Sequence, residues 1–274
     1  MPKPVINAAD LAAKLASTDP PLVLDVRWKL GGASAYPEYL AAHIPGAVFV
    51  DLEQDLCGPP GEGGRHPLPD LAELQIALRA AGVTANREVV VYDFGDGMAA
   101  ARAWWTLRWA GHPRVQVLDG GFPAWAASGE PTTDTPTVVE PGDFEVQPGG
   151  MPMLDAASAA SLAQSSDGVL LDARVPERFR GETEPIDAVA GHIPGALNLP
   201  YGKLVNADGT LRKDLVSVLP AAIHVGAYCG SGITAAHTVL ALHQAGHEEA
   251  ALYVGSWSHW ITDKDRPIAT GPAS

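Results

Sequence analysis

Short apolar runs alternate with longer amphipathic or alanine-rich stretches along the chain. The apolar runs lie at 22–24, 89–91 and 117–118 in the first half, and at 169–171, 225–228 and 252–254 in the second. Alanine-rich stretches typical of helices follow at 98–110 and 234–245. Brief uninterrupted apolar runs are typical of strands buried on both faces, as in parallel sheets. The pattern predicts an α/β fold with helices on both faces of a sheet.

Two short motifs occur in each half, in the same order. The pentapeptide His-Ile-Pro-Gly-Ala stands at 43–47 and again at 192–196, and Asp-x-Arg ends an apolar run at 25–27 and at 172–174. Elements repeated in one order indicate duplication rather than chance matches. We therefore expect two tandem domains of the same architecture, each a parallel sheet flanked by helices.

Composition predicts where the two domains are joined. Residues 131–150 are rich in Pro, Thr and Gly and lack helical periodicity, which is typical of a linker. We expect an N-terminal domain over 1–133, a linker over 134–150 and a C-terminal domain over 151–274.

The charge of the chain narrows its possible partners. Formal net charge is −14, with 46% hydrophobic and 18% charged residues. A field of that sign repels nucleic-acid phosphates and anionic lipid, so we expect neither nucleic acid nor a membrane as a partner. No apolar run approaches the ~20 residues of a membrane span, and the N-terminal residues do not resemble a signal peptide. A cytoplasmic location is the resulting expectation.

The chain has two cysteines, Cys57 and Cys229. Two are too few for a disulfide framework or a structural zinc set, so we expect free thiols, no metal and no cofactor. Cys57 lies in a turn-rich Cys-Gly-Pro-Pro-Gly loop and is interpreted as a bystander. Cys229 follows a predicted strand and precedes a predicted helix, whereas Asp93 takes that place in the first half. Only the second half is therefore predicted to carry cysteine chemistry.

The segment after the predicted strand reads Cys229-Gly-Ser-Gly-Ile-Thr234. Gly230 and Gly232 let the backbone turn tightly and direct its N–H groups inward. The helix expected to begin near Thr234 adds free N–H groups at the same place. Such a cradle stabilises an anion and favours a thiolate or a persulfide. The loop alone also fits a buried structural cysteine.

Other cysteine chemistries fit this loop poorly. A cysteine-dependent phosphatase resembles Cys-x5-Arg, but the sixth residue after Cys229 is Ala235. A Cys-x-x-Cys redox motif fails at Gly232, and a dinucleotide-binding fingerprint would need glycine at 235.

At this point the sequence resembles the tandem rhodanese-like sulfurtransferases. The loop from Cys229 to Thr234 resembles the active-site loop of the 3-mercaptopyruvate branch, with Ile233 where valine is more usual. The thiosulfate branch typically carries basic residues just after the cysteine, where this chain has Gly230 and Ser231. The pentapeptides and the Asp-x-Arg motifs are family features too, so the resemblance covers nearly the whole chain. It implies an inactive N-terminal domain and a catalytic C-terminal one.

The resemblance also implies catalytic partners for Cys229. Ser231 would pair with a histidine, matched by His66, and with an acid that falls at Glu53. The family more often has aspartate there. If this stretch is extended, Asp51 and Asp55 share the face of Glu53 and could replace it. The acid would orient the histidine, which would polarise the serine and move a proton on or off sulfur.

The resemblance places substrate binding at Arg178 and at Gly230, Gly232, Ile233 and Thr234 of the loop. A guanidinium is suited to binding a carboxylate, because two of its N–H groups can donate to the two carboxylate oxygens at once. The branch usually has a second carboxylate-binding arginine shortly downstream, but Asp187 stands at that place. The departure leaves two alternatives, that Arg180 takes over this role or that the enzyme prefers a different donor.

The implied function is transfer of sulfane sulfur from a small anionic donor, 3-mercaptopyruvate, to a thiol or cyanide through a Cys229 persulfide. Thiosulfate is the alternative donor. The alternative from another class is a non-catalytic persulfide carrier or sensor.

Overall fold

The computed structural model describes residues 3–219 and 221–272, which form two compact units. The first unit contains residues 1–58, 69–150 and 206–211, and the second contains 59–68, 151–205 and 212–274. Each unit thus includes one short segment from the other half of the sequence. The boundaries expected at 133 and 151 stay a prediction.

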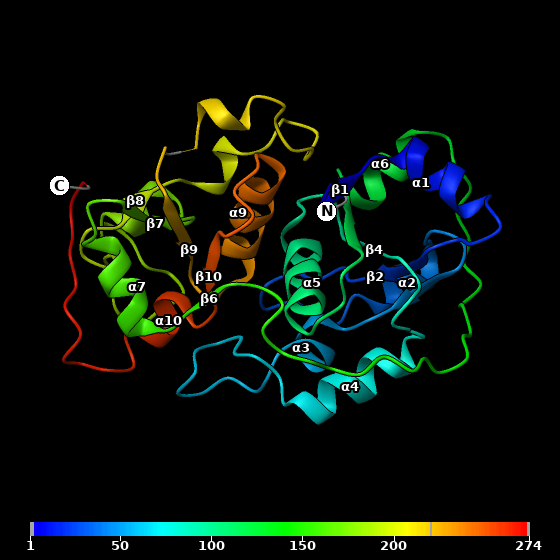
Figure 1. The fold of residues 1–274 in the computed structure, drawn as a ribbon, viewed down its shortest axis with the longest axis horizontal. Coiled ribbons are helices and arrows are strands. Elements are labelled where there is room, and N and C mark those ends of the chain that lie inside the picture. The colour runs from blue at the N-terminus through cyan, green and yellow to red at the C-terminus, as the bar shows by residue number, and fades with distance from the viewer. Residues whose placement is uncertain (1–2, 220, 273–274) are drawn as a thin grey trace. The chain divides into compact units, whose positions relative to one another are not determined.

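The first unit is built on a five-stranded parallel sheet in the order β1-β5-β4-β2-β3 (Figure 1). Its strands are β1 (Val5–Ile6), β2 (Leu22–Asp25), β3 (Ala47–Phe49), β4 (Val89–Tyr92) and β5 (Val115–Leu118). Its helices are α1 (Ala8–Leu15), α2 (Tyr36–Ala41), α3 (Leu52–Asp55), α4 (Leu71–Ala80), α5 (Met98–Trp109) and α6 (Gly121–Ala127).

The second unit repeats this plan, with a parallel sheet in the order β6-β10-β9-β7-β8. Its strands are β6 (Met153–Leu154), β7 (Gly168–Asp172), β8 (Leu197–Asn198), β9 (His224–Tyr228) and β10 (Ala251–Tyr253). Its helices are α7 (Ala156–Ala163), α8 (Pro176–Phe179), α9 (Ile233–Gln244) and α10 (Ser256–Trp260), with short 3-10 turns η1 (Tyr201–Lys203) and η2 (Leu215–Ser217). The repeated order confirms the predicted α/β fold of two duplicated domains.

Helices bury both faces of each sheet, which is why the central strands are continuously apolar. All four residues of β2 and of β4 are buried. In the first unit Leu11 of α1 and Trp125 of α6 pack on one face against Val23 and Val90. In the second unit α7 and α10 cover one face and α9 the other (Figure 1). Burial of each such aromatic side chain contributes a few kcal/mol.

The Asp-x-Arg motif forms a buried ion pair at the end of the second strand of each unit. Nη2 of Arg27 lies 2.7 Å from Oδ2 of Asp25, and Nη2 of Arg174 lies 2.6 Å from Oδ2 of Asp172. Each guanidinium also donates to a backbone carbonyl beside the pentapeptide, at Ala42 and at Gly191. The motif therefore ties the strand to the segment that enters the next strand.

The pentapeptide histidines have matching structural roles. Nδ1 of His43 lies 2.7 Å from the carbonyl oxygen of Tyr39, and Nδ1 of His192 lies 2.8 Å from that of Phe179. Each ring also stacks on the aromatic ring of the same residue. Both histidines are buried, so the repeated motif is part of the scaffold.

The stretch expected to link the domains lies along the first unit without a helix or strand. Its backbone amides donate to carbonyls of that unit, from Gly142 to Arg79 at 2.7 Å and from Gln147 to Ala110 at 2.8 Å. In the part of the chain that the structure describes, no helix is long and apolar enough to cross a membrane.

The buried pair in the first unit predicts a specific loss of stability. Asp25→Asn keeps the shape of the side chain but leaves the Arg27 guanidinium buried without a counter-charge. We expect the free energy of unfolding to fall by about 3–5 kcal/mol, measured by chemical denaturation. The same change at the exposed Asp134 is the control and should have little effect. Equal losses in both variants would contradict the role assigned to the pair.

Candidate active site

Cys229 lies directly after β9 and before α9, at the carboxyl edge of the second sheet. Its side chain is buried, with 3% of the residue exposed. Its backbone is fixed on both sides, because its N–H donates to Oγ of Ser256 at 3.1 Å and its carbonyl accepts from the N–H of Trp257 at 3.0 Å. Ligands bind at this edge in open α/β sheets.

The loop after Cys229 directs a backbone N–H at the sulfur. The N–H of Gly232 donates to Sγ at 3.2 Å, and Gly232 has φ +82° as the N-cap of α9. Ile233 is the first residue of α9 and is buried, and Thr234 follows it, half-buried. The positive end of this helix dipole also favours an anionic sulfur.

The same place in the first unit holds an anion cradle around a carboxylate. The side chain of Asp93, just after β4, accepts hydrogen bonds from three backbone N–H groups, those of Gly95, Gly97 and Ala100, at 2.9, 3.1 and 3.0 Å. Burial raises the pKa of Asp93 to about 7, and Asp96 adds to the rise, while the three N–H groups oppose it. In each unit the strand-to-helix loop therefore directs backbone N–H groups at the side chain of its first residue, three of them at Asp93 and that of Gly232 at Cys229.

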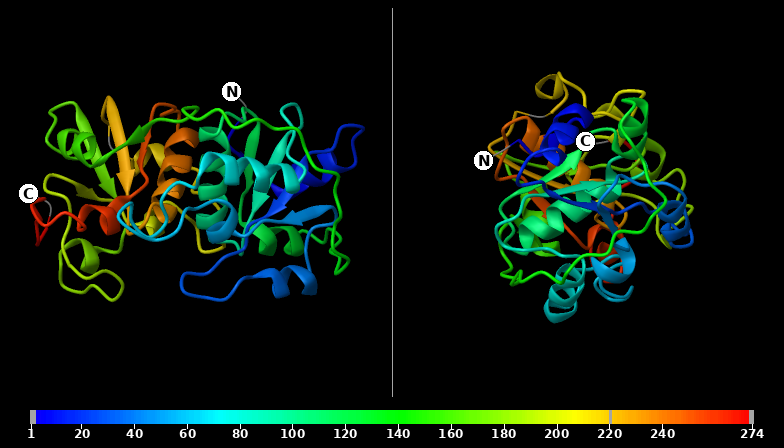
Figure 2. Two further views of the ribbon diagram at one scale, coloured as in Figure 1. Left: turned by 90° about the horizontal axis from the view of Figure 1, so that it is seen from below. Right: turned by 90° about the vertical axis from the view of Figure 1, so that its right-hand side faces the viewer.

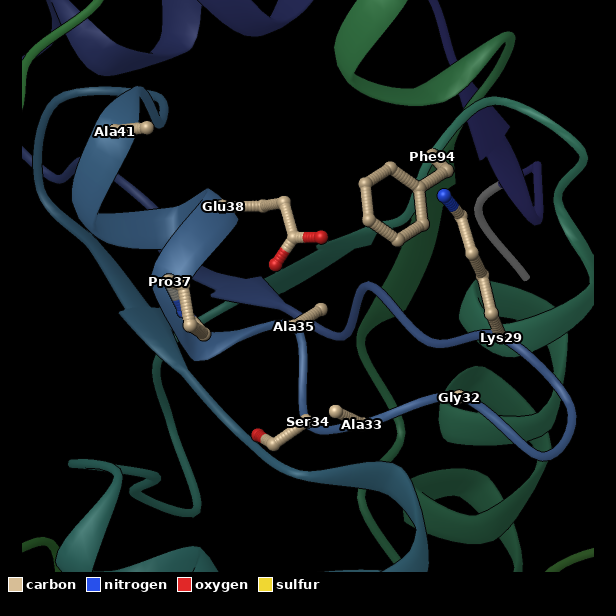
Figure 3. A pocket seen from close by; sticks show the side chains of 9 residues that line it. All are labelled: Lys29, Gly32, Ala33, Ser34, Ala35, Pro37, Glu38, Ala41 and Phe94. Carbon is tan, nitrogen blue, oxygen red and sulfur yellow. The ribbon is translucent and has the colours of Figure 1, made fainter.

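A hollow of about 380 Å³ opens at this edge of the first sheet (Figure 3). The carboxylate of Glu38 and the ring of Phe94 face it, and Nζ of Lys29 lies 4.7 Å from the centre of that ring. Phe94 takes the position after Asp93, where the second unit has Gly230 after Cys229.

Ser231 is hydrogen-bonded to His66. The serine Oγ lies 2.8 Å from Nδ1 of the histidine, and both residues are 6% exposed. The pair joins positions 165 apart in the sequence. The proton that the two atoms share resides on one or the other according to the histidine tautomer. This arrangement can relay a proton within the loop that begins at Cys229.

The segment 59–68 brings His66 to the second unit, where it runs beside α10 (Figure 2). The N–H of Arg65 donates to Oγ of Ser258 at 3.1 Å. Gly64 has φ +103°, and a Cβ built on it would lie 2.8 Å from the carbonyl oxygen of Gly255. Only glycine fits this close approach, so Gly64 sets how near the segment lies to the Cys229 loop.

Arg178, on α8, is bound by two buried carboxylates. Its Nη2 lies 2.7 Å from Oε1 of Glu184 and 3.0 Å from Oδ2 of Asp187. Asp187 also forms an ion pair with Nη1 of Arg65. Burial raises the pKa of Asp187, and the Glu184 carboxylate adds to the rise, whereas Arg65 and Arg178 oppose it. Burial also acts to raise the pKa of Glu184, but hydrogen bonds from Arg178 and the amides of residues 186 and 187 outweigh it and lower that pKa.

Glu53 lies in the first unit, where it accepts a hydrogen bond from Nε1 of Trp28 at 2.9 Å. Its segment is the one-turn helix α3 rather than an extended stretch, so the assumption that positions 51, 53 and 55 share a strand face is wrong. Asp51 caps this helix by accepting from the amides of Glu53 and Gln54. The role expected of Glu53 stays a prediction.

Two further residues considered in the sequence analysis, Arg180 and Cys57, have the following surroundings. Arg180 pairs with the exposed Glu182 at 2.7 Å, and its role as a substitute for the second arginine stays a prediction. Cys57 is buried, and that burial raises the pKa of its thiol against the opposing effect of Arg102, so it stays protonated. Within residues 3–219 and 221–272, no group of three or more His, Cys, Asp or Glu is placed to hold a metal ion.

Sequence reasoning missed Arg65. Its guanidinium lies over the Cys229 loop, because a Cβ built on Gly230 would be 2.7 Å from Nη2 of Arg65. The available signal was its place next to His66, a residue that the family resemblance already brought to the loop.

Both halves of the chain match one protein family. The rhodanese-like domain family matches residues 7–128 and 155–263. The chain belongs to this family and is a sulfurtransferase built from two rhodanese-like domains.

Its similarity to other proteins extends over nearly their full length. A Pseudomonas aeruginosa protein named "Probable 3-mercaptopyruvate sulfurtransferase" is 46% identical, over 97% of this chain and 98% of that protein. SseB of Mycobacterium tuberculosis, provisionally named a thiosulfate sulfurtransferase, is 43% identical over 98% of both chains. The crystal structure of SseA from Escherichia coli, described as a 3-mercaptopyruvate sulfotransferase, matches with a TM-score of 0.82 and 30% identity, covering 93% of this chain and 99% of SseA. These matches confirm the predicted family and enzyme class.

The close approach at Gly64 gives a first prediction for this site. Gly64→Ala should push the segment 59–68 away from the Cys229 loop, and kcat/KM for sulfur transfer should fall by roughly 10²-fold, since small displacements at a reacting centre cost that much. Gly61→Ala in the same segment is the control, because a Cβ there meets nothing within 4 Å. Steady-state kinetics of both variants decide the matter, and unchanged activity in Gly64→Ala would refute it.

The raised pKa of Asp93 gives a prediction about pH. Between pH ~4, the ordinary value for this group, and about 7, the folded chain holds a proton that the unfolded chain releases. The contribution of Asp93 to the free energy of unfolding therefore declines as pH rises through this window. Denaturation of wild type and Asp93→Asn at several pH values should show the wild-type advantage shrinking with pH. A difference that stays constant across the window would count against the shifted pKa.

Proposed function

We propose that Cys229 takes sulfane sulfur from 3-mercaptopyruvate as a persulfide and passes it to a thiol or to cyanide. The observation that carries the proposal is the setting of Sγ, which accepts the N–H of Gly232 while Ser231 and His66 form a hydrogen-bonded pair in the same loop region. Together these supply an anion-stabilising cradle and a proton relay next to one nucleophile.

The first half-reaction breaks the carbon–sulfur bond of the donor. The Cys229 thiolate attacks the donor sulfur, the new sulfur–sulfur bond forms, and the bonding electrons leave with the carbon as pyruvate enolate. The enolate then takes a proton and becomes pyruvate. In the second half-reaction cyanide or a thiolate attacks the outer sulfur, and Cys229 leaves as thiolate. Two half-reactions through a covalent intermediate produce ping-pong kinetics.

Ser231 and His66 move the proton in this proposal. The donor thiol must lose a proton as its sulfur becomes part of the persulfide, and the enolate carbon must gain one. The 2.8 Å contact between Ser231 and His66 supports a relay that takes up the first proton and supplies the second. Glu53 is the proposed residue that orients the histidine.

Arg178 and the loop residues Gly230, Gly232, Ile233 and Thr234 are the proposed donor-binding set. The uncharged neighbours of Cys229, together with the Pseudomonas aeruginosa name and that of SseA, favour 3-mercaptopyruvate. Thiosulfate is a second candidate donor, because the name of the 43%-identical SseB favours it. The donor is a small anion in either case.

We further propose that the first unit is catalytically inactive. Asp93, a carboxylate that cannot carry sulfane sulfur, occupies the cradle where the second unit has Cys229. A cytoplasmic location is also proposed, since both cysteines are free thiols, as a reducing compartment keeps them.

The central prediction concerns the nucleophile. Cys229→Ser should abolish sulfur transfer, whereas Cys57→Ser should retain it, because Cys57 is a buried, protonated bystander. Thiocyanate formation from each donor and cyanide measures this, and intact mass after donor alone should increase by one sulfur atom in wild type and not in Cys229→Ser. Appreciable turnover by Cys229→Ser would overturn the mechanism.

The proposed relay predicts that His66→Ala lowers kcat by ~10²–10⁴-fold. His224→Ala is a suitable control, since His224 is exposed and lies at the far end of the strand that leads to Cys229. If His66→Ala were as active as wild type, a persulfide carrier without its own proton chemistry would become the better description. The ratio of kcat/KM for 3-mercaptopyruvate and thiosulfate in wild type decides the donor.

A further inference from the structure

We infer that Arg65 is a second binding residue for the acid group of the sulfur donor, forming with Arg178 a two-guanidinium clamp above Gly230. The inference rests on the proposed function of Cys229 and adds the residue that helps to hold the donor. It names an arginine from the first half of the sequence that neither composition nor motif singled out.

The guanidinium groups of Arg65 and Arg178 both lie close to Gly230. A Cβ built on Gly230 would lie 2.7 Å from Nη2 of Arg65 and 3.5 and 3.7 Å from Nη2 and Nη1 of Arg178. Both guanidiniums therefore lie over the residue that follows the nucleophile. Since Gly230 has no side chain, Nη2 of Arg65 can lie where a Cβ would clash with it.

Asp187 explains how two cations remain side by side. Its Oδ1 pairs with Nη1 of Arg65 and its Oδ2 lies 3.0 Å from Nη2 of Arg178, so one carboxylate bridges both arginines. The side chain of Asp187 is 4% exposed, while those of Arg65 and Arg178 are 24% and 13% exposed. The negative charge thus lies beneath the pair and the cations reach the surface of the cluster.

Donor groups remain for a ligand. Arg65 uses Nη1 on Asp187, while its buried Nε has no hydrogen-bond partner among the residues that the structure describes. In Arg178, Nε donates to Glu184 and Nη2 contacts both Glu184 and Asp187. Its Nη1 also lies near Gly230, 3.7 Å from the position of a Cβ built there. Nη2 of Arg65 and Nη1 of Arg178 are therefore placed to bind one anionic group between them.

The negative charge of the protein and of the donor explains why two arginines are needed to bind the donor. The chain carries −14 overall, which repels an anionic donor at long range. Near the loop, Glu184 and Asp187 cancel the charges of Arg178 and Arg65, so attraction depends on directed hydrogen bonds rather than on net charge. A carboxylate and a sulfonate both offer the oxygen pairs that such a clamp binds.

The test measures donor binding without turnover. In a Cys229→Ser background, which cannot form a persulfide, the affinity for 3-mercaptopyruvate and for thiosulfate is measured by calorimetry. Adding Arg65→Gln should weaken binding of the donor by ~10-fold, the loss expected for a charge-assisted hydrogen bond. Arg65→Lys should lose less, because it keeps the charge without the fork. Arg212→Gln is the matched control, since Arg212 pairs with Asp214 at the surface of the same unit.

The uncharged methyl ester of 3-mercaptopyruvate separates anion binding from a displaced loop. Arg65→Gln should bind the ester as well as the Arg65 parent does, and in the Cys229 enzyme it should raise KM for the anionic donor with little change in kcat. Equal affinity of Arg65→Gln and its parent for both anions, or an equal loss for the ester, would overturn the inference. Absence of turnover in the wild-type enzyme would instead refute the proposed function, while the binding result would still decide the role of Arg65.

Discussion

An unbroken chain of alternating charges ties the Cys229 region to the end of β7. It runs from Asp172 to Arg174 at 2.6 Å and on to Glu184 at 3.4 Å. Arg178 follows at 2.7 Å, then Asp187 at 3.0 Å, and Arg65 ends the chain. Each buried charge would cost several kcal/mol alone, so each member is tolerated only because its neighbours carry the opposite sign. The positions of the partly buried Arg178 and Arg65 are therefore fixed by the rigid end of a central strand.

This series of ion pairs is also what distinguishes the second unit from the first beside the second strand of each sheet. Asp25 and Arg27 form the equivalent of the Asp172–Arg174 pair, and each arginine lies over an aromatic ring, 4.8 Å from the centre of Phe122 or of Trp257. Arg174 in addition pairs with Glu184, which continues the series of charges toward Arg178. The duplicated part of the structure is the sheet, the pentapeptide and the ion pair. The chemistry differs through what each copy adds at the carboxyl edge of that sheet.

The fold could be predicted from the sequence because local sequence patterns specify it and each pattern occurs twice. Apolar runs, the pentapeptide and Asp-x-Arg each depend on a few neighbouring residues, so their repetition indicated two parallel sheets. Cys229 was equally visible, since a strand, two glycines and a helix follow each other directly. The helical turn around Glu53 was missed, although Asp51 is a good N-cap residue and signalled it.

Arg65 and the part played by Asp187 could not be predicted in the same way. Their ion pair joins positions 122 apart, and no periodicity or spacing records a contact of that range. The His66–Ser231 pair has the same difficulty and was expected only through the family resemblance. Long-range side-chain contacts depend on where complete loops pack, which local propensity does not determine.

The inclusion of residues 59–68 in the second unit has a consequence for how this protein can evolve. A gene fragment that encoded residues 151–274 alone would retain Cys229 and the whole second sheet but would lack both Arg65 and His66. The ancestral repeats have become mutually dependent, so recombination that shuffles one copy into another protein would transfer a sulfur-binding thiol without the residues proposed to make it an enzyme.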